Sequence, residues 1–157
     1  MMLCKARRQP RGRQAGVGML EVLIAVLIVS IGFLGMAALQ AKALSTNNSS
    51  MARSMATVAS YSILDAMRAD SAAADSGTYN QTVTANACGA IGGGSLATVQ
   101  LTQWCKQLGS SLGAVASTTG KINCGNTGIC TVTITFDDSR AGKGGSATQT
   151  VATTAGL

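Results

Sequence analysis

The sequence predicts an α+β fold: a long N-terminal helix, membrane-spanning in its first part, packed on a small antiparallel sheet with disulfides. Three observations lead to this expectation. Residues 22–39 (VLIAVLIVSIGFLGMAAL) contain no charged side chain, and neither glycine nor proline interrupts residues 37–69. The C-terminal part combines an alternating strand pattern with four cysteines.

Four segments follow from composition. A chain of 157 residues accommodates one modest domain with accessory segments. Residues 1–16 form a basic leader, 17–42 a transmembrane helix, 43–72 an amphipathic continuation of that helix, and 73–157 a disulfide-stapled, β-rich domain.

Charge is concentrated at the N-terminus. The formal net charge is +6, but five of the twelve basic residues lie in the first thirteen positions with no acid among them. Removing that stretch would leave seven bases and six acids, a balance of 7 − 6 = +1. A basic patch for phosphates would then hardly exist, so we expect no specific nucleic-acid partner.

The uncharged run is long enough to cross a bilayer. At 1.5 Å per residue a helix over residues 22–39 spans about 27 Å. The flanking Lys and Arg side chains favour a cytoplasmic N-terminus and a translocated C-terminus. A secretory signal peptide is the alternative, but its apolar core typically has about 7–15 residues. Small residues at 37–43 leave a conventional cleavage site open.

Glu21 is a carboxylate directly before the apolar run. At a helix centre in a membrane such a group costs about 2.5–3.5 kcal/mol, and less near the boundary. One interpretation is an interfacial glutamate stabilised by the helix dipole. The other is that Glu21 requires a cationic partner that the free chain lacks.

The C-terminal cysteines indicate two disulfides in an oxidising compartment. The gaps between Cys88, Cys105, Cys124 and Cys130 are 16, 18 and 5 residues, and the chain has no histidine, which disfavours zinc. Four cysteines allow three pairings. We favour Cys124 with Cys130 across the turn-rich residues 125–128, leaving Cys88 with Cys105.

Helical spacing continues beyond the apolar run. Leu44, Met51, Met55 and Val58 fall on one face, which we expect to face the core of the C-terminal domain. Residues 47–50 (NNSS) are the weakest helical stretch and a place for a bend.

The remaining pattern predicts strands and one further helix. Residues 131–136 (TVTITF) alternate as a strand, and 78–84 and 148–153 are weaker strand candidates. A short helix is expected within 95–112, with Trp104 as a core anchor.

No catalytic residue, cofactor or metal is expected, and so no enzymatic activity. Without histidine a Ser-His-Asp or Cys-His nucleophile is impossible. The glycine-rich residues 89–94 lack the Lys-Ser/Thr of a phosphate loop. Asp137 and Asp138 are adjacent without further acidic ligands, so a solvated turn is favoured over a calcium site.

Residues 16–21 (GVGMLE) before the apolar helix resemble the type IV prepilin signature. The resemblance implies a leader cut after Gly16 by prepilin peptidase, N-methylation of Val17, and Glu21 at the fifth mature position. The family usually has Phe-Thr where this chain has Val17-Gly18. In that family the glutamate pairs with the N-terminal amine of its own or a neighbouring subunit.

Residues 31–44 (IGFLGMAALQAKAL) and 64–70 (LDAMRAD) resemble minor pilins of the type IV pilus modification protein PilV family. This implies a pilin-like fold and a subunit of the inner membrane, with its C-terminal domain in the periplasm before it enters a pilus. The implied partners are prepilin peptidase, other minor pilins and the major pilin, and the implied roles are pilus assembly, twitching motility and adhesion. The alternatives are a type II secretion pseudopilin, a DNA-binding or adhesive pilin module, and a plain signal-anchored periplasmic protein.

Overall fold

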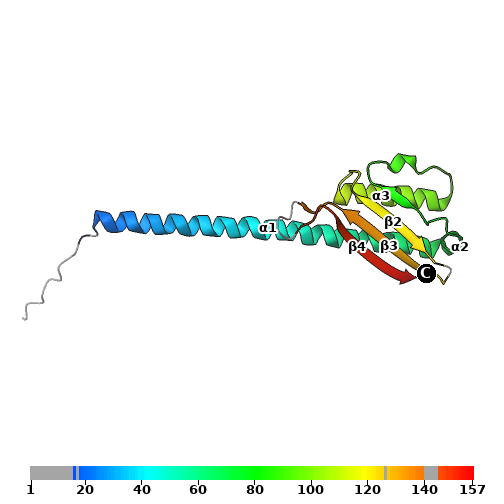
Figure 1. Ribbon diagram of the computed structural model, residues 1–157, viewed down its shortest axis with the longest axis horizontal. Helices are drawn as coiled ribbons and strands as arrows, with labels where there is room; N and C mark the ends of the chain where they lie inside the picture. The colour runs from blue at the N-terminus through cyan, green and yellow to red at the C-terminus, as the bar shows by residue number, and fades with distance from the viewer. Residues whose placement is uncertain (1–15, 17, 126, 140–144) are drawn as a thin grey trace, which may run out of the picture. The chain divides into compact units, whose positions relative to one another are not determined.

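The computed structural model describes residues 16, 18–125, 127–139 and 145–157. The chain divides into two compact units, Met1–Gln40 and Ala41–Leu157, called here the N-terminal and C-terminal units. Helix α1 (Met19–Ala69) begins in the first and ends in the second. Figure 1 shows it as the longest element of the chain.

Helix α1 is continuous through residues 47–50, the stretch that the sequence indicated as the weakest part of the helix and a place for a bend. Several hydroxyls in this part donate to the carbonyl four residues earlier, as Thr46 does to Lys42 O (3.0 Å) and Ser50 to Thr46 O (3.1 Å). Such bonds satisfy the side chains without leaving the helix, so polar residues are accommodated there.

The described strands of the C-terminal unit form a four-stranded antiparallel sheet in the order β1-β2-β3-β4. Its strands are β1 (Thr82–Thr84), β2 (Thr119–Cys124), β3 (Ile129–Phe136) and β4 (Gln149–Gly156). The strand predicted at 131–136 is confirmed as part of β3. The candidates at 78–84 and 148–153 correspond to the shorter β1 and the longer β4, and β2 was not predicted.

In the residues that the structure describes, three helices follow α1. They are α2 (Ser71–Asp75), the 3₁₀ turn η1 (Cys88–Ala90) and α3 (Leu96–Leu112). Helix α3 fills nearly all of the predicted range because both of its ends have strong signals. Ser95 caps its N-terminus by accepting from Thr98 N at 3.3 Å, and Gly113 ends it with φ = 108°.

Helices α1 and α3 pack on the same face of the sheet (Figure 1). Trp104 of α3, 3% exposed, donates from Nε1 to Ala59 O of α1 at 2.9 Å. Its ring also covers Gly120 of β2, where a Cβ would lie 2.4 Å from Trp104 Cη2. The predicted role of Trp104 as a core anchor is confirmed.

The predicted core face of α1 was wrong. Leu44, Met51, Met55 and Val58 are 65%, 58%, 38% and 58% exposed. The buried face consists mainly of small residues followed by one turn of large ones: Ala56, Ala59, Ser60, Ile63, Leu64 and Met67. Small side chains let the helix approach the sheet and α3 closely, which brings the carbonyl of Ala59 within reach of the indole.

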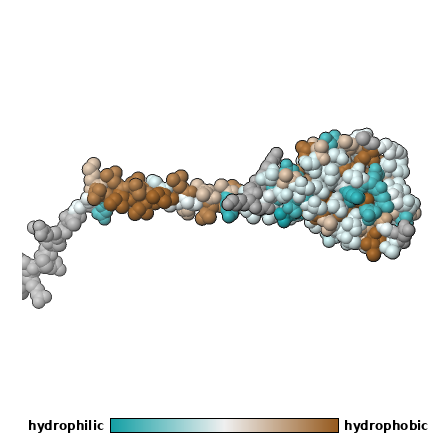
Figure 2. All heavy atoms as spheres, viewed as in Figure 1, coloured by the Kyte–Doolittle hydropathy of each residue, from teal (hydrophilic) through white to brown (hydrophobic). Residues whose placement is uncertain are grey.

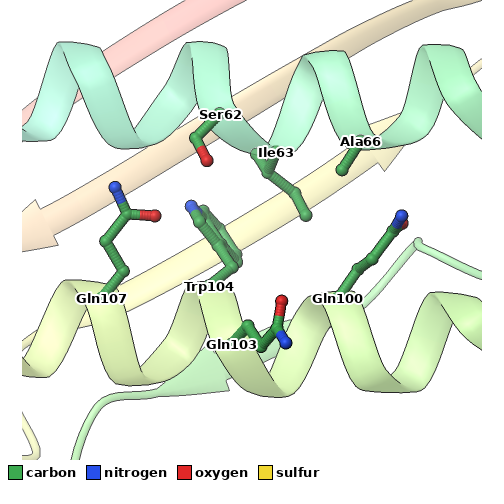
Figure 3. A pocket seen from close by; sticks show the side chains of 7 residues that line it. All are labelled: Ser62, Ile63, Ala66, Gln100, Gln103, Trp104 and Gln107. Carbon is green, nitrogen blue, oxygen red and sulfur yellow. The ribbon is translucent and has the colours of Figure 1, made fainter.

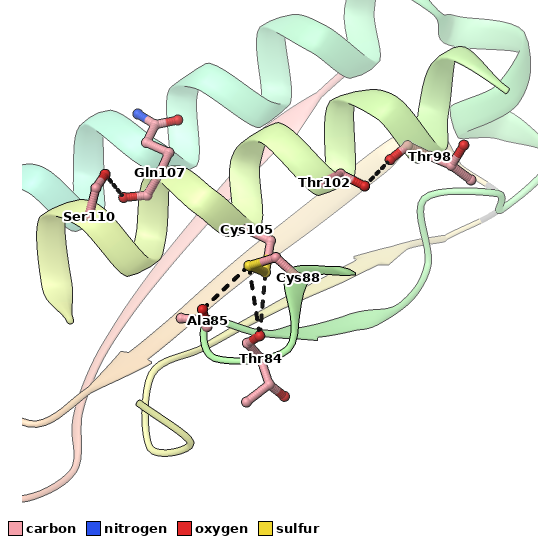
Figure 4. The surroundings of a disulfide bond; sticks show 8 residues. All are labelled: Thr84, Ala85, Cys88, Thr98, Thr102, Cys105, Gln107 and Ser110. Atoms are coloured by element: carbon pink, nitrogen blue, oxygen red, sulfur yellow. Dashed lines mark hydrogen bonds between the residues drawn. A yellow bond between two sulfur atoms is a disulfide. The ribbon is translucent and has the colours of Figure 1, made fainter. Parts of the chain in front are cut away.

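Both disulfides are those that the sequence favoured. Cys88 and Cys105 tie η1 to α3 with a Cα–Cα distance of 5.5 Å (Figure 4). Cys124 and Cys130 close the β2–β3 hairpin as directly opposed residues, 3.9 Å apart at Cα. Ala85 O lies 3.4 Å from Cys88 Sγ, and because a disulfide sulfur carries no proton this is a contact rather than a hydrogen bond.

Candidate functional site

Glu21 lies in the first turn of α1, immediately before the apolar run. The carbonyl of Gly18 accepts from Glu21 N at 2.9 Å and from Val22 N at 3.3 Å, so the helix begins at this point. The carboxylate is therefore close to the positive end of the helix dipole. Among the residues that the structure describes, the single ion pair joins Arg68 and Asp65, so Glu21 has no cationic partner there.

Of the two sequence-predicted cleavage residues, the structure describes Gly16. Gly16 is exposed, and a Cβ added to it would have no atom within 4 Å. Val17, predicted to become the methylated N-terminus, lies outside the described residues, as do residues 1–15 of the predicted leader.

The apolar run of α1 is exposed along its length. Figure 2 shows hydrophobic surface covering this part of the helix. By length and composition α1 is the one helix in the described part of the chain able to cross a membrane. Its exposed large apolar side chains there include Val22, Leu23, Ile24, Val26, Leu27, Ile28, Val29, Ile31, Phe33 and Leu34.

A second exposed apolar surface lies on α1 within the C-terminal unit. It consists of Leu44, Met51, Met55 and Val58, and we call it the outer stripe. These residues are spaced by seven, four and three positions, so they share one side of the helix. The outer stripe faces away from the core that the sheet and α3 form with α1.

The loop after β3 contains a buried carboxylate that sequence reasoning assigned to a solvated turn. Asp138 is 6% exposed and accepts a short hydrogen bond from the hydroxyl of Ser49, itself 7% exposed. Its backbone N–H donates to Ser146 O at 2.8 Å. The chain after β3 is thereby tied to α1, and the prediction of a solvated Asp138 was wrong because a hydroxyl 89 positions away supplies its donor.

A second polar network lies at the end of α1. The hydroxyl of Tyr79, a fully buried residue, donates to Asp70 Oδ2 at 3.1 Å and contacts Gln100 Oε1. Burial, then the hydrogen bond from Tyr79 to Asp70 and the charge of that carboxylate, raise the pKa of Tyr79 to about 12. Tyr79 is therefore a neutral structural donor at physiological pH.

A small groove lies between α1 and α3. Figure 3 shows Gln100, Gln103 and Gln107 of α3 opposite Ser62 and Ala66 of α1. Its volume is about 140 Å³, below the roughly 300–1,000 Å³ of ligand pockets. Its amides can donate and accept hydrogen bonds, but the groove holds no charged side chain.

Nothing in the described ranges gathers three side chains suited to hold a metal ion. Asp137 accepts from Ser139 N at 2.8 Å, and Asp138 is engaged by Ser49. The buried Asp138 and the outer stripe are the features that sequence reasoning missed. The first has no local signal, and the second was visible as a helical face but was assigned to the wrong side.

Comparisons with protein-family models, curated proteins and solved structures find no match to this chain. The class that the structure itself defines is an α+β protein with a membrane-compatible N-terminal helix and a disulfide-bonded C-terminal unit.

Proposed function

We propose that this chain is a minor pilin of a type IV pilus. In this proposal prepilin peptidase cuts after Gly16, Val17 becomes the methylated N-terminus, and α1 passes from the inner membrane into the filament. The C-terminal unit resides in the periplasm before assembly. The partners are other minor pilins and the major pilin, and the protein supports twitching motility and adhesion.

The observation that carries the proposal is the position of Glu21, which begins an exposed apolar helix and lies five positions after Gly16. Among the residues that the structure describes, no cationic side chain pairs with it. A membrane accommodates the apolar side chains but leaves the carboxylate unpaired. A cut after Gly16 creates an amine at residue 17. A buried carboxylate next to a buried ammonium is tolerated when the two pair.

The outer stripe is consistent with the same role. The membrane run ends near Leu39, yet Leu44, Met51, Met55 and Val58 continue an exposed apolar surface into the C-terminal unit. In a filament held by helix packing, this surface would be covered by helices of neighbouring subunits.

The proposal is tested by the N-terminal sequence and intact mass of the membrane-extracted chain, with and without prepilin peptidase. We expect a chain starting at methylated Val17 only when the peptidase is present. A chain that still starts at residue 1 or 2, or is cut near Ala41, would remove the proposal. Deletion should impair twitching rather than exoprotein secretion, since loss of secretion alone would indicate a type II secretion pseudopilin.

Replacement Glu21→Gln tests the carboxylate itself. The amide preserves size and removes the charge, so we expect membrane insertion and cleavage to persist while incorporation into sheared filaments falls at least about tenfold, as expected for loss of about 1.4 kcal/mol or more. Asp65→Asn, which alters an exposed carboxylate on the same helix, is the matched control. Normal incorporation of the Gln variant would refute the role of Glu21.

A further inference from the structure

The exposed side of α1 in the C-terminal unit follows a heptad spacing. Between residues 41 and 62, one set of residues recurs at alternating intervals of three and four positions, an average of about 3.5. This is the repeat of helices that wind around each other in a left-handed coiled coil. The set, which contains the outer stripe, is called here the heptad seam, and all of its members are exposed: Ala41, Leu44, Asn48, Met51, Met55, Val58 and Ser62.

The heptad seam and the buried side of α1 are different sides of the helix. Ser49, Ala56 and Ile63 are buried and also repeat every seven positions, each one residue after a member of the seam. One residue turns the helix by about 100°, so these side chains point into the core while the seam points elsewhere. A second helix could therefore lie along the seam without displacing the core contacts of the C-terminal unit.

Asn48 is a polar residue in the middle of this pattern. It is exposed, and within the described residues no hydrogen bond reaches its side-chain amide. The hydroxyls beside it differ, because Thr46 and Ser50 donate to carbonyls four residues earlier. Asn48 follows Leu44 by four positions and precedes Met51 by three, which makes it an a position with d positions on both sides. In parallel two-stranded coiled coils a single asparagine at an a position specifies the register and the number of strands.

We propose that α1 pairs with α1 of a second copy of this chain, parallel and in register along the heptad seam. The two Asn48 side chains then face each other, and an amide can both donate and accept in such a pair. Leu44, Met51 and Val58 meet their own copies at d positions, and Met55 does so at an a position. Chains anchored in one membrane by the same helix run in the same direction, which favours the parallel pair. The inference rests on the proposed function in this one respect, that α1 is the anchor.

Charge does not oppose pairing with a second copy. Arg53 is turned to β4, where it donates to Gln149 Oε1 at 3.1 Å. Asp65 occupies the next d position and would face its own copy, so the seam ends at Ser62; Asp65 is instead paired with Arg68 at 2.7 Å. The e and g positions that border the seam meet across a parallel pair and carry no charge: Ser45, Ala52 and Ala59 on one side, Asn47, Ser54 and Tyr61 on the other.

The seam is short for an interface between free chains. A contact over residues 41–62 is about 33 Å long and about 10 Å wide, so two copies together bury roughly 700 Å², below the roughly 1,200–2,000 Å² of standard interfaces. We therefore expect pairing where a common membrane raises the effective concentration. In the sequence the same spacing extends back to Leu34 and Ala37, and small residues such as Ala37 and Ala41 let helices approach closely in a membrane. A closed two-fold pair does not propagate helically, so the pairing concerns chains before they enter a filament.

The experiment is disulfide crosslinking of full-length variants in membrane vesicles, in a Cys4→Ser background with copper phenanthroline as oxidant. Val58→Cys places two thiols at facing d positions near one end of the seam, and Leu44→Cys does so near the other end. We expect each variant to give a crosslinked dimer, since an antiparallel or staggered pair cannot bring both positions against their own copies. Thr57→Cys, an exposed neighbour that points about 100° away from Val58, is the matched control and should crosslink at least about tenfold less.

Two further variants test the seam itself. Met51→Glu places two carboxylates face to face between the crosslinked positions and should lower the yield of Val58→Cys at least about tenfold. Ser50→Glu adds the same charge at an exposed position beside the seam and should leave the yield unchanged. Asn48→Leu removes the amide pair that specifies two strands, so amine-reactive crosslinking should then give species larger than the dimer seen with the native chain.

Absence of either crosslink in folded chains, or equal yields from Val58→Cys and Thr57→Cys, would overturn the pairing. A yield insensitive to Met51→Glu, or Asn48→Leu chains that form only dimers, would overturn the seam as the contact. Intact mass verifies both native disulfides in every variant. The seam lies outside the leader, so the crosslinks should form with or without prepilin peptidase, and carbonate extraction of the same vesicles measures anchoring. Failure of the pairing and failure of the proposed function are thus distinguished.

Discussion

Gly120 of β2 lies beneath the indole of Trp104, and Gly120→Ala places a methyl group in that contact. The added Cβ would be 2.4 Å from Trp104 Cη2, 2.8 Å from Cζ3 and 2.7 Å from Leu108 Cδ1. Carbon atoms prefer separations of about 3.5–4.0 Å, so the ring has to move by more than about 1 Å. Leu108 presents the end of a flexible side chain, but the indole is held by its bond to Ala59 O.

The expected loss of stability is about 2–3 kcal/mol. Overpacking a core costs about 1–3 kcal/mol, and loss of the indole hydrogen bond adds about 1 kcal/mol. Removal of a glycine from a strand offsets about 0.5–1 kcal/mol of this sum. For a unit of this size, we expect the Tm to fall by about 10 °C.

The assay is thermal unfolding of the full chain in detergent, followed by circular dichroism and analysed as a double-mutant cycle. Phenylalanine lacks the outer ring atoms that clash, so Gly120→Ala should cost at least about 1 kcal/mol less in a Trp104→Phe background. Gly156→Ala, with no atom within 4 Å of its added methyl group, is the neutral control. Equal costs of Gly120→Ala in the two backgrounds would refute the assignment of the clash to the indole.

Three further predictions concern the C-terminal unit. Ser49→Ala removes the donor to the buried carboxylate of Asp138 and should lower the free energy of unfolding by about 1–3 kcal/mol, measured by the same thermal unfolding. Thr46→Ala, at an exposed position one turn earlier, is the control and should change this free energy by no more than about 0.5 kcal/mol. Replacing Cys88 and Cys105 by serine should lower the free energy of unfolding by about 3 kcal/mol, and replacing Cys124 and Cys130 should lower it by about 2 kcal/mol. The first disulfide joins residues 17 positions apart and the second residues 6 positions apart, and a disulfide that closes a longer loop restricts the unfolded chain more. The reverse order of the two losses would contradict this reasoning. The pKa of Tyr79 is raised from 10.0 to about 12 in the folded chain, so the folded state retains a proton that the unfolded chain releases. Stability should therefore fall between about pH 10 and 12, measured as the urea midpoint, and Tyr79→Phe should lose this part of the pH dependence.

Features with a local signal were predicted well. Residues 22–39 contain no charged side chain, residues 131–136 alternate strictly, and the turn-rich sequence 125–128 separates Cys124 from Cys130, which lie opposite each other. Each of these signals depends on neighbours in the chain and is therefore visible in the sequence.

Strand β2 was not predicted because a side chain of another element fills part of the space over its buried face. Its sequence, TGKINC, has Gly120 and Ile122 as its buried positions, which is too little apolar character to indicate a strand. The indole of Trp104 fills the space above Gly120. A strand with a glycine at one of its two buried positions becomes recognisable only when the helix that covers it is known.

The wrong face of α1 was chosen because hydrophobic periodicity identifies apolar faces without saying what covers them. Met51, Met55 and Val58 form a convincing apolar side, but Ala56 and Ala59 face the core. Small residues bury little area each, yet they set the distance between backbones. The partner of Asp138 was likewise not predictable, because Ser49 lies in a distant segment and a hydroxyl is a common surface group.

In most amphipathic helices the large apolar residues tolerate mutation least and small residues such as alanine tolerate it best. The alanine-rich inner face of α1 reverses this order. At Ala56 and Ala59 any larger side chain would push the helix from the sheet and separate Ala59 O from the indole. The bulky residues of the outer stripe can exchange among themselves without disturbing the fold of their own unit. Saturation mutagenesis scored by folding alone would therefore find the alanines intolerant and the methionines permissive, the opposite of what residue size and hydrophobicity suggest.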